Sequence, residues 1–114
     1  MLKIFGIPNC DTVKKALKWL EAEEVNHTFH DFRRDGLDEE LLQTWIDVVG
    51  WKILLNKRGT TFRNLPDDQK IHVDEISAYC LMLEQVAIIR RPVMVGSHGI
   101  SVGFTEEIRT RILA

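Results

Sequence analysis

Cys10 is the residue of this sequence best placed to act as a nucleophile. It follows the turn-forming residues Pro8 and Asn9, and it precedes a segment with helical periodicity that begins near Asp11. At a helix start, unpaired backbone N–H groups and the positive end of the helix dipole favour a thiolate over a thiol. A small buried hydrophobe is the usual state of a free cysteine, but turns lie at the surface. We therefore expect Cys10 to be a reactive thiol.

A helix start alone does not ionise a cysteine at neutral pH. The pKa of a free thiol is about 8.5, and lowering it by two units takes about 2.7 kcal/mol. A helix N-terminus supplies about 0.3 to 1 kcal/mol, or about 2 kcal/mol in a partly buried site. The carboxylate of Asp11 acts in the opposite sense unless it turns outward to cap the helix. A cation from elsewhere in the chain is therefore required.

Four basic residues are candidates for this cation: Arg90 and Arg91, which precede Pro92, and Lys57 and Arg58, which lie in a turn-forming loop. A planar guanidinium suits both a thiolate and an oxyanion. A solvated surface charge is nevertheless the commoner state of any single Arg or Lys. We favour Arg91, because a residue directly before proline is sterically restricted.

The remaining cysteine and the histidines suggest no second reactive centre. Cys80 has apolar neighbours at helical spacing, so we expect a packed, inert thiol. The four histidines form no metal-ligand pattern with the two cysteines, so no metal site is expected. No second cysteine follows Cys10 within one helical turn, and the thiol that resolves it must then come from another molecule.

Composition sets further limits. The chain has 114 residues, 45% of them hydrophobic and 28% charged, as in one soluble globular domain. A net charge of -2 gives no basis for a nucleic-acid partner. There is no secretory signal and no apolar run of the roughly 20 residues that span a bilayer. We expect a cytoplasmic protein with both cysteines reduced, no membrane association, and a monomeric state.

The elements that must position Cys10 follow from hydrophobic periodicity. Residues 2–6 predict a buried strand, residues 11–24 an amphipathic helix and residues 25–32 a second strand, so the N-terminal third is a βαβ unit. The middle predicts helices at 37–49, 51–55 and 74–84, the last capped by Asp74 with Ile76, Tyr79, Cys80 and Leu83 on its apolar stripe.

The C-terminal part predicts two short strands and a helix. Residues 91–95 and 100–103 form a hairpin around a four-residue, glycine-bounded turn, and Thr105 caps the last helix. The order βαβ, helices, ββα is that of an α/β protein.

Three segments together resemble the glutaredoxin-linked arsenate reductase (ArsC-like) family, in its YffB branch and related to the Spx regulators. They are residues 6–16, 54–59 and 90–93, with the sequences GIPNCDTVKKA, LLNKRG and RRPV. The resemblance covers essentially the whole chain. It implies a thioredoxin-like fold with a four-stranded mixed sheet, and a single domain over residues 1–114 with a helical insertion at about 37–88.

The resemblance also implies roles for individual residues. Cys10 is the nucleophile, and Arg91 steadies the thiolate or a bound oxyanion. Pro92 is expected to be a cis-proline that faces the cysteine. A further arginine of arsenate reductases has no counterpart here, because Ser101 stands at about its place. The residues expected to bind substrate are Asn9, Asp11, Thr12, Lys57, Arg58, Arg90 and Pro92.

The function implied is that of a glutathione-dependent thiol oxidoreductase. Cys10 attacks a small oxidised thiol or an oxyanion, glutathione acts as co-substrate, glutaredoxin is a further candidate partner, and no cofactor is tightly bound. The alternative is an Spx-like regulatory module that contacts a protein partner such as RNA polymerase through Lys57, Arg58 and Arg63. Many Spx proteins carry a Cys-x-x-Cys switch, but Val13 occupies its second position here.

Overall fold

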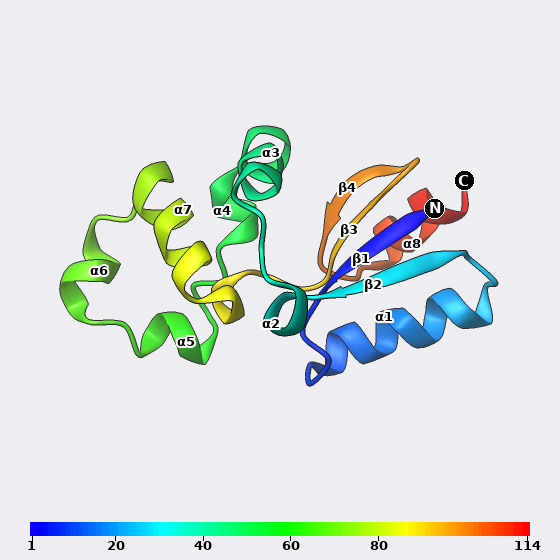
Figure 1. The fold of residues 1–114 in the computed structure, drawn as a ribbon, viewed down its shortest axis with the longest axis horizontal. Helices are drawn as coiled ribbons and strands as arrows, with labels where there is room; N and C mark the ends of the chain where they lie inside the picture. The colour runs from blue at the N-terminus through cyan, green and yellow to red at the C-terminus, as the bar shows by residue number, and fades with distance from the viewer. The chain divides into compact units, whose positions relative to one another are not determined.

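The computed structural model describes all 114 residues, which form two compact units (Figure 1). One unit combines residues 1–36 with residues 91–114, and the other comprises residues 37–90. The interpretation of the whole chain as a single domain stays a prediction. No helix has the length and apolar character needed to cross a bilayer.

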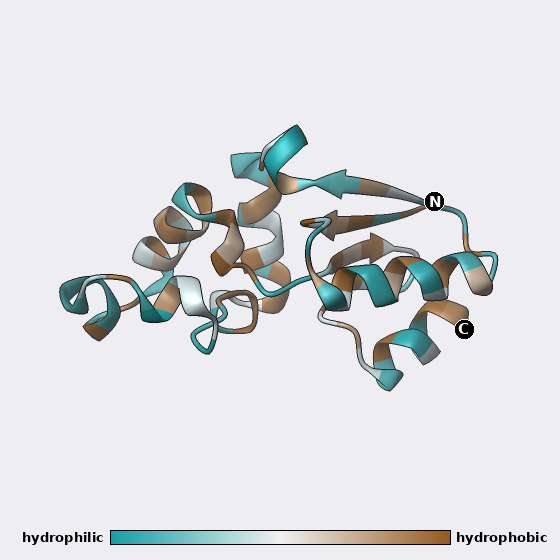
Figure 2. Cartoon of the chain, turned by 90° about the horizontal axis from the view of Figure 1, so that it is seen from below, coloured by the Kyte–Doolittle hydropathy of each residue, from teal (hydrophilic) through white to brown (hydrophobic).

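The first unit is built on a four-stranded mixed sheet, as predicted. Its strands are β1 (Leu2–Gly6), β2 (His27–Asp31), β3 (Val93–Gly96) and β4 (Gly99–Val102). Their order is β2-β1-β3-β4, with β1 parallel to β2 and antiparallel to β3, and with β3 antiparallel to β4. The strand β1 is mostly hydrophobic, whereas the edge strand β2 is mostly hydrophilic (Figure 2).

Two helices pack on one face of this sheet. They are α1 (Asp11–Ala22) and α8 (Glu106–Leu113). The α1 residues Ala16 and Leu20 and the α8 residue Ile108 join Ile4 and Met94 in one hydrophobic cluster. Ile4 and Met94 are paired across β1 and β3, so they point to the same face. The apolar spacing predicted from the sequence is therefore the packed side of α1.

A short helix lies at the end of the N-terminal part of this unit. The helix α2 (Phe32–Asp35) begins after Asp31, whose side chain accepts a hydrogen bond from the Arg33 N–H at 2.9 Å. The sequence predicted only a break in the pattern here. Four residues are too few to show helical periodicity, which explains the omission.

The second unit is helical, as residues 37–88 predict. Its helices are α3 (Glu39–Val49), α4 (Trp51–Leu54), α5 (Thr60–Arg63), α6 (Asp67–Ile71) and α7 (Glu75–Glu84), followed by the 3-10 helix η1 (Val86–Ile88). Leu42, Trp45 and Met82 are fully buried. An isolated β-bridge joins Leu55 to Ile89.

The predicted buried side of α7 is wrong. Asp74 caps this helix as expected, in a capping box with Ser77. The buried residues, however, are Ala78, Leu81 and Met82, whereas Ile76 is 75% exposed. Because apolar residues occur on more than one side of α7, periodicity alone does not identify the side that packs.

Candidate active site

Cys10 is the N-cap residue of α1. Its backbone is extended, with φ -139° and ψ 123°, and its carbonyl accepts the first helical hydrogen bond from the Lys14 N–H at 2.9 Å. The side chain is half-buried. The sulfur lies near the N–H groups of Thr12 and Val13, which stabilise a thiolate without meeting the geometry of a side-chain cap.

The surroundings of Cys10 act on its pKa in opposite directions. Burial of the sulfur raises the pKa and is the largest single effect. The Val13 N–H, the hydrogen bond and charge of the Arg91 guanidinium, and the Thr12 N–H each lower it. Together they outweigh burial, so the pKa of Cys10 lies below its ordinary value. The carboxylate of Asp11 is exposed.

The sheet brings Arg91 to the cysteine. Phe5 near the end of β1 pairs with Val93 at the start of β3 in an antiparallel register. The two residues before Val93 therefore lie beside the chain that leaves β1 toward Cys10. The Arg91–Pro92 peptide bond is cis, which confirms the isomer implied by the family resemblance. Arg91 is half-buried and Pro92 is buried.

The end of β1 lies close to the first turn of α1 at Gly6, which the sequence did not predict. A Cβ atom placed on Gly6 would lie 2.7 Å from Cγ2 of Val13, whose side chain is fully buried. Gly6 thus permits the end of β1 to approach the first turn of α1 closely. The sequence feature that could have predicted this close approach is Gly6 itself, directly before the loop.

The other predicted site residues divide between the two units. Asn9, Asp11 and Thr12 are exposed and flank Cys10 in the first unit. Lys57, Arg58 and Arg90 belong to the second unit. Their part in substrate binding stays a prediction.

Local contacts define the basic loop of the second unit. The Arg58 N–H donates to the side-chain oxygen of Asn56 at 3.1 Å, and the ammonium of Lys57 lies 5.8 Å from the ring centre of Trp51. The Arg90 Nε–H donates to the Ile53 carbonyl at 3.2 Å.

Three further observations concern the residues that could take part in chemistry. No group of three or more His, Cys, Asp or Glu side chains is placed to hold a metal ion. Ser101 is 3% exposed, and its hydroxyl lies 3.0 Å from Nε2 of His98. Cys80 is exposed, so the expectation of a packed thiol is wrong.

Comparison with known proteins gives consistent similarities. The ArsC family model matches residues 5–111. A protein of Haemophilus influenzae described as uncharacterized is 42% identical over 107 residues, which are 94% of each chain. The global transcriptional regulator Spx of Streptococcus agalactiae is 31% identical over 112 residues, covering 94% of this chain and 79% of that protein.

Solved structures show the same family similarity. The structure of a YffB protein has a TM-score of 0.93 at 42% identity and covers 100% of both chains. That of an arsenate reductase (ArsC) related protein from Brucella melitensis has a TM-score of 0.79 at 44% identity, over 98% of this chain and 93% of that chain. The predicted thioredoxin-like α/β fold is confirmed by these neighbours.

Proposed function

Because this chain belongs to the ArsC family, we propose that it is a glutathione-dependent thiol oxidoreductase with the thiolate of Cys10 as its nucleophile. The observation that supports this proposal most is the balance at Cys10: two backbone N–H groups and the Arg91 guanidinium hold the pKa of the thiol low despite its burial. The thiolate is the reactive form in thiol–disulfide exchange. Dependence on glutathione fits a reducing compartment, the cytoplasm.

The proposed reaction has two exchange steps. In the first, the Cys10 thiolate attacks the glutathione sulfur of a mixed disulfide between glutathione and a substrate thiol. The S–S bond of the substrate breaks, a Cys10–glutathione disulfide forms, and the substrate leaves as a thiolate. In the second, the thiolate of free glutathione attacks that disulfide, releasing oxidised glutathione and restoring the Cys10 thiolate. In total one free glutathione thiol is oxidised, the substrate thiol is regenerated, and the product is oxidised glutathione.

Arg91 supports both steps through its charge. The guanidinium stabilises the thiolate of Cys10 before the first attack and again when that thiolate leaves in the second. A leaving group of lower pKa departs faster, so the same interaction promotes release. Val13 stands where a Cys-x-x-Cys protein has its second cysteine, which is why the resolving thiol is external.

An oxidised thiol suits this site better than arsenate. The family resemblance implies an additional arginine in arsenate reductases at about the position of Ser101, which in this chain is a buried hydroxyl beside His98. A doubly charged oxyanion needs several cationic or N–H donors at once, whereas a disulfide carries no charge at its sulfurs. We therefore place arsenate second among the candidate substrates.

Turnover of a glutathionylated model thiol tests the proposal. The assay follows oxidised glutathione in the presence of excess glutathione, for wild type, Cys10→Ser and Cys80→Ser. We expect loss of turnover in Cys10→Ser, because Cys10 is the sulfur that the Val13 and Thr12 N–H groups and Arg91 stabilise as a thiolate. We expect wild-type turnover in Cys80→Ser, because Cys80 belongs to the other unit. Equal turnover in wild type and Cys10→Ser would contradict the proposal.

The similarity to Spx regulators supports a second candidate, a regulatory module that binds RNA polymerase. In this alternative the basic residues Lys57, Arg58 and Arg63 contact the partner. Size-exclusion chromatography with purified bacterial RNA polymerase at low salt distinguishes the two. Co-elution that is lost on charge reversal at the three positions favours the regulator, and separate elution favours the enzyme.

A further inference from the structure

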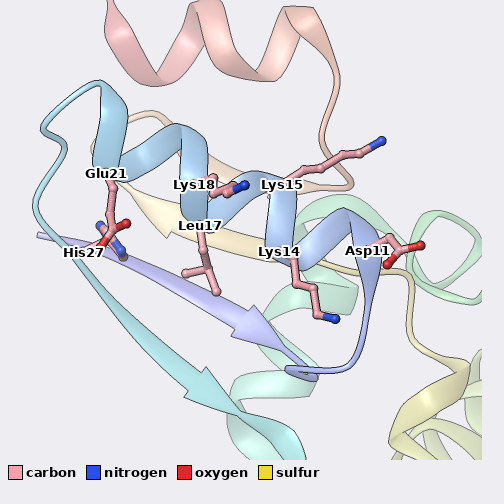
Figure 3. A pocket seen from close by; sticks show the side chains of 7 residues that line it. All are labelled: Asp11, Lys14, Lys15, Leu17, Lys18, Glu21 and His27. Carbon is pink, nitrogen blue, oxygen red and sulfur yellow. The ribbon is translucent and has the colours of Figure 1, made fainter.

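A groove of about 620 Å³ runs along α1, the helix that Cys10 begins. Figure 3 shows the residues that line it: Asp11, Lys14, Lys15, Leu17, Lys18 and Glu21 from α1, and His27 from the start of β2. Asp11 lies at the end near Cys10, while Glu21 and His27 lie at the opposite end. The groove and the candidate nucleophile therefore share one helix of one unit.

The ammonium groups in this groove are available to a ligand. Lys14, Lys15 and Lys18 are the cationic lining residues, and all three are exposed. Neither ion pair of the structure involves any of them. The half-buried Leu17 lies between Lys14 and Lys18 in the sequence and adds an apolar contact. Such a surface can accept carboxylates without first breaking an internal ion pair.

The order of charges along α1 does not serve the stability of the helix. Acidic residues stabilise a helix at its N-terminus and basic residues at its C-terminus. Apart from Asp11, α1 has the reverse order, because Lys14 and Lys15 lie in its N-terminal half, Glu21 lies near its end, and no basic residue occurs in the last turn. These lysines instead raise the positive potential on the side of the helix that leads to Cys10.

The spacing of the groove fits an extended polypeptide. Lys14 and Lys18 are four residues apart on the helix, which corresponds to a rise of about 6 Å. Alternate residues of an extended chain are separated by about 6.6 Å and point to the same side. From Asp11 to Glu21 the groove spans about 15 Å, the length of four or five extended residues. The edge strand β2 runs beside it, with one side of its backbone unpaired in the sheet.

We propose that this groove binds an acidic segment of the protein whose mixed disulfide Cys10 reduces, with acidic residues at alternate positions facing Lys14 and Lys18. The inference rests on the proposed function, because it names the substrate class of the same cysteine. The groove is longer than a tripeptide thiol requires. A nucleic acid is disfavoured, because its phosphates follow one another without a gap and would also face the carboxylates of Asp11 and Glu21 at the two ends of the groove.

Nuclear magnetic resonance titration of the labelled full-length Cys10→Ser protein tests the groove without any exchange chemistry. The probe is the capped peptide Gly-Glu-Ala-Glu-Ala-Gly, and the neutral peptide Gly-Gln-Ala-Gln-Ala-Gly is its control. We expect amide shifts in α1 and β2 with the acidic peptide only. Lys14→Gln/Lys18→Gln should weaken binding by about fivefold, the effect of losing two exposed charge contacts.

A matched variant controls for net charge. Lys3→Gln/Lys52→Gln removes the same number of charges from exposed positions outside the groove, and it should bind the acidic peptide as the parent does. Equal weakening by both double variants, equal binding of the neutral peptide, or tighter binding of a short oligothymidylate to α1 would each overturn the inference.

The two proposals fail separately. Lack of peptide binding, together with turnover of a small glutathionylated thiol by the wild type, would overturn the groove and leave the proposed function intact. Peptide binding without any turnover would contradict the proposed function and support the groove as a site for acidic segments.

Discussion

Burial, backbone N–H groups and one guanidinium determine the pKa of Cys10. Burial raises its pKa, whereas the N–H groups of Val13 and Thr12 and the guanidinium of Arg91 lower it. Arg91 is the only side chain among the groups that lower the pKa, so it can be removed without changing the backbone at the helix start. The role of this one residue is therefore open to direct measurement.

Replacement of Arg91 tests this balance. Arg91→Met removes a charged hydrogen-bond donor, so we expect the pKa of Cys10 to rise. Each unit of that rise lowers the thiolate fraction at neutral pH by up to about tenfold. The measurement is the rate of Cys10 alkylation against pH, read by mass spectrometry of the Cys10 peptide. Arg33→Met, at an exposed arginine of the same unit, should leave the profile unchanged, and identical profiles for all three proteins would refute the role of Arg91.

At the residue scale, sequence reasoning succeeded where local context decides. A cysteine before a helical pattern predicts its own N–H donors, and an arginine before proline is a restricted residue. The choice between Arg91 and the loop residues Lys57 and Arg58 depends on tertiary structure, which spacing does not contain. Cys80 was predicted to be buried because its neighbours are apolar, yet it is exposed, since those neighbours do not define the packed side of α7.

The connection between β1 and α1 sets the position of Cys10 at the scale of elements. Gly6→Ala would place a Cβ atom 2.7 Å from the buried Val13 side chain. We expect destabilisation of about 1 to 3 kcal/mol, as for other overpacked sites, together with slower alkylation of Cys10, because the first turn of α1 must shift. Urea unfolding and the alkylation assay measure the two effects.

A double variant tests whether the clash with Val13 causes the destabilisation by Gly6→Ala. Val13→Ala removes the atom that Gly6→Ala would strike, so Gly6→Ala should cost less in that background than in the wild type. Additive free energies of unfolding would show that the two positions do not interact, contrary to the structure.

The cap of α8 is a second test at this scale. The hydroxyl of Thr105 accepts a hydrogen bond from the Ile108 N–H at 3.3 Å, and Ile108 belongs to the hydrophobic cluster under the sheet. Thr105→Ala should lower the free energy of unfolding by about 1 kcal/mol. Thr110→Ala, at an exposed position within the same helix, should be neutral or slightly stabilising because alanine is the better helix former. A smaller loss for Thr105→Ala than for Thr110→Ala would contradict this assignment.

The long helices could be predicted from the sequence, whereas three of the short helices could not. The apolar spacing of α1 and the cap of α8 are local signals, and both predictions are confirmed. The helices α2, α5 and α6 have four or five residues and show no periodicity. The hairpin connection is shorter than expected, because β3 extends to Gly96 and β4 begins at Gly99. The order of the four strands was not predicted, because the pairing of β1 with β3 is a long-range contact that local patterns do not contain.

At the scale of the whole molecule, the candidate site combines a residue from the N-terminal part of the chain with one from the C-terminal part. Cys10 and Arg91 are separated by the entire second unit in the sequence, yet both belong to the unit that contains the sheet. Their proximity depends on the pairing of β1 with β3, which is a long-range contact. Ionisation of Cys10 is therefore coupled to folding of the chain.

This coupling predicts a pH dependence of stability. The pKa of Cys10 is lower in the folded protein than in the unfolded chain, so the folded state binds protons less readily. The resulting stabilisation is fully present above the unfolded value of about 8.5 and is lost as the pH falls through the folded pKa. We expect the free energy of unfolding of the wild type to increase relative to that of Cys10→Ser as the pH rises toward about 8.5. Urea unfolding of both proteins under reducing conditions measures this change. A decrease in the stability of the wild type relative to Cys10→Ser over this pH range would be inconsistent with a lowered pKa of Cys10.

The most direct test of the account is titration of the Cys10 thiolate itself. Ultraviolet absorbance of the thiolate is followed against pH in the Cys80→Ser protein, with Cys10→Ser/Cys80→Ser as the blank. Because Arg91 and the first N–H groups of α1 outweigh burial, we predict ionisation below the ordinary cysteine value of about 8.5. Ionisation at or above that value would mean that the folded chain does not activate this sulfur, and the proposed oxidoreductase mechanism would be wrong.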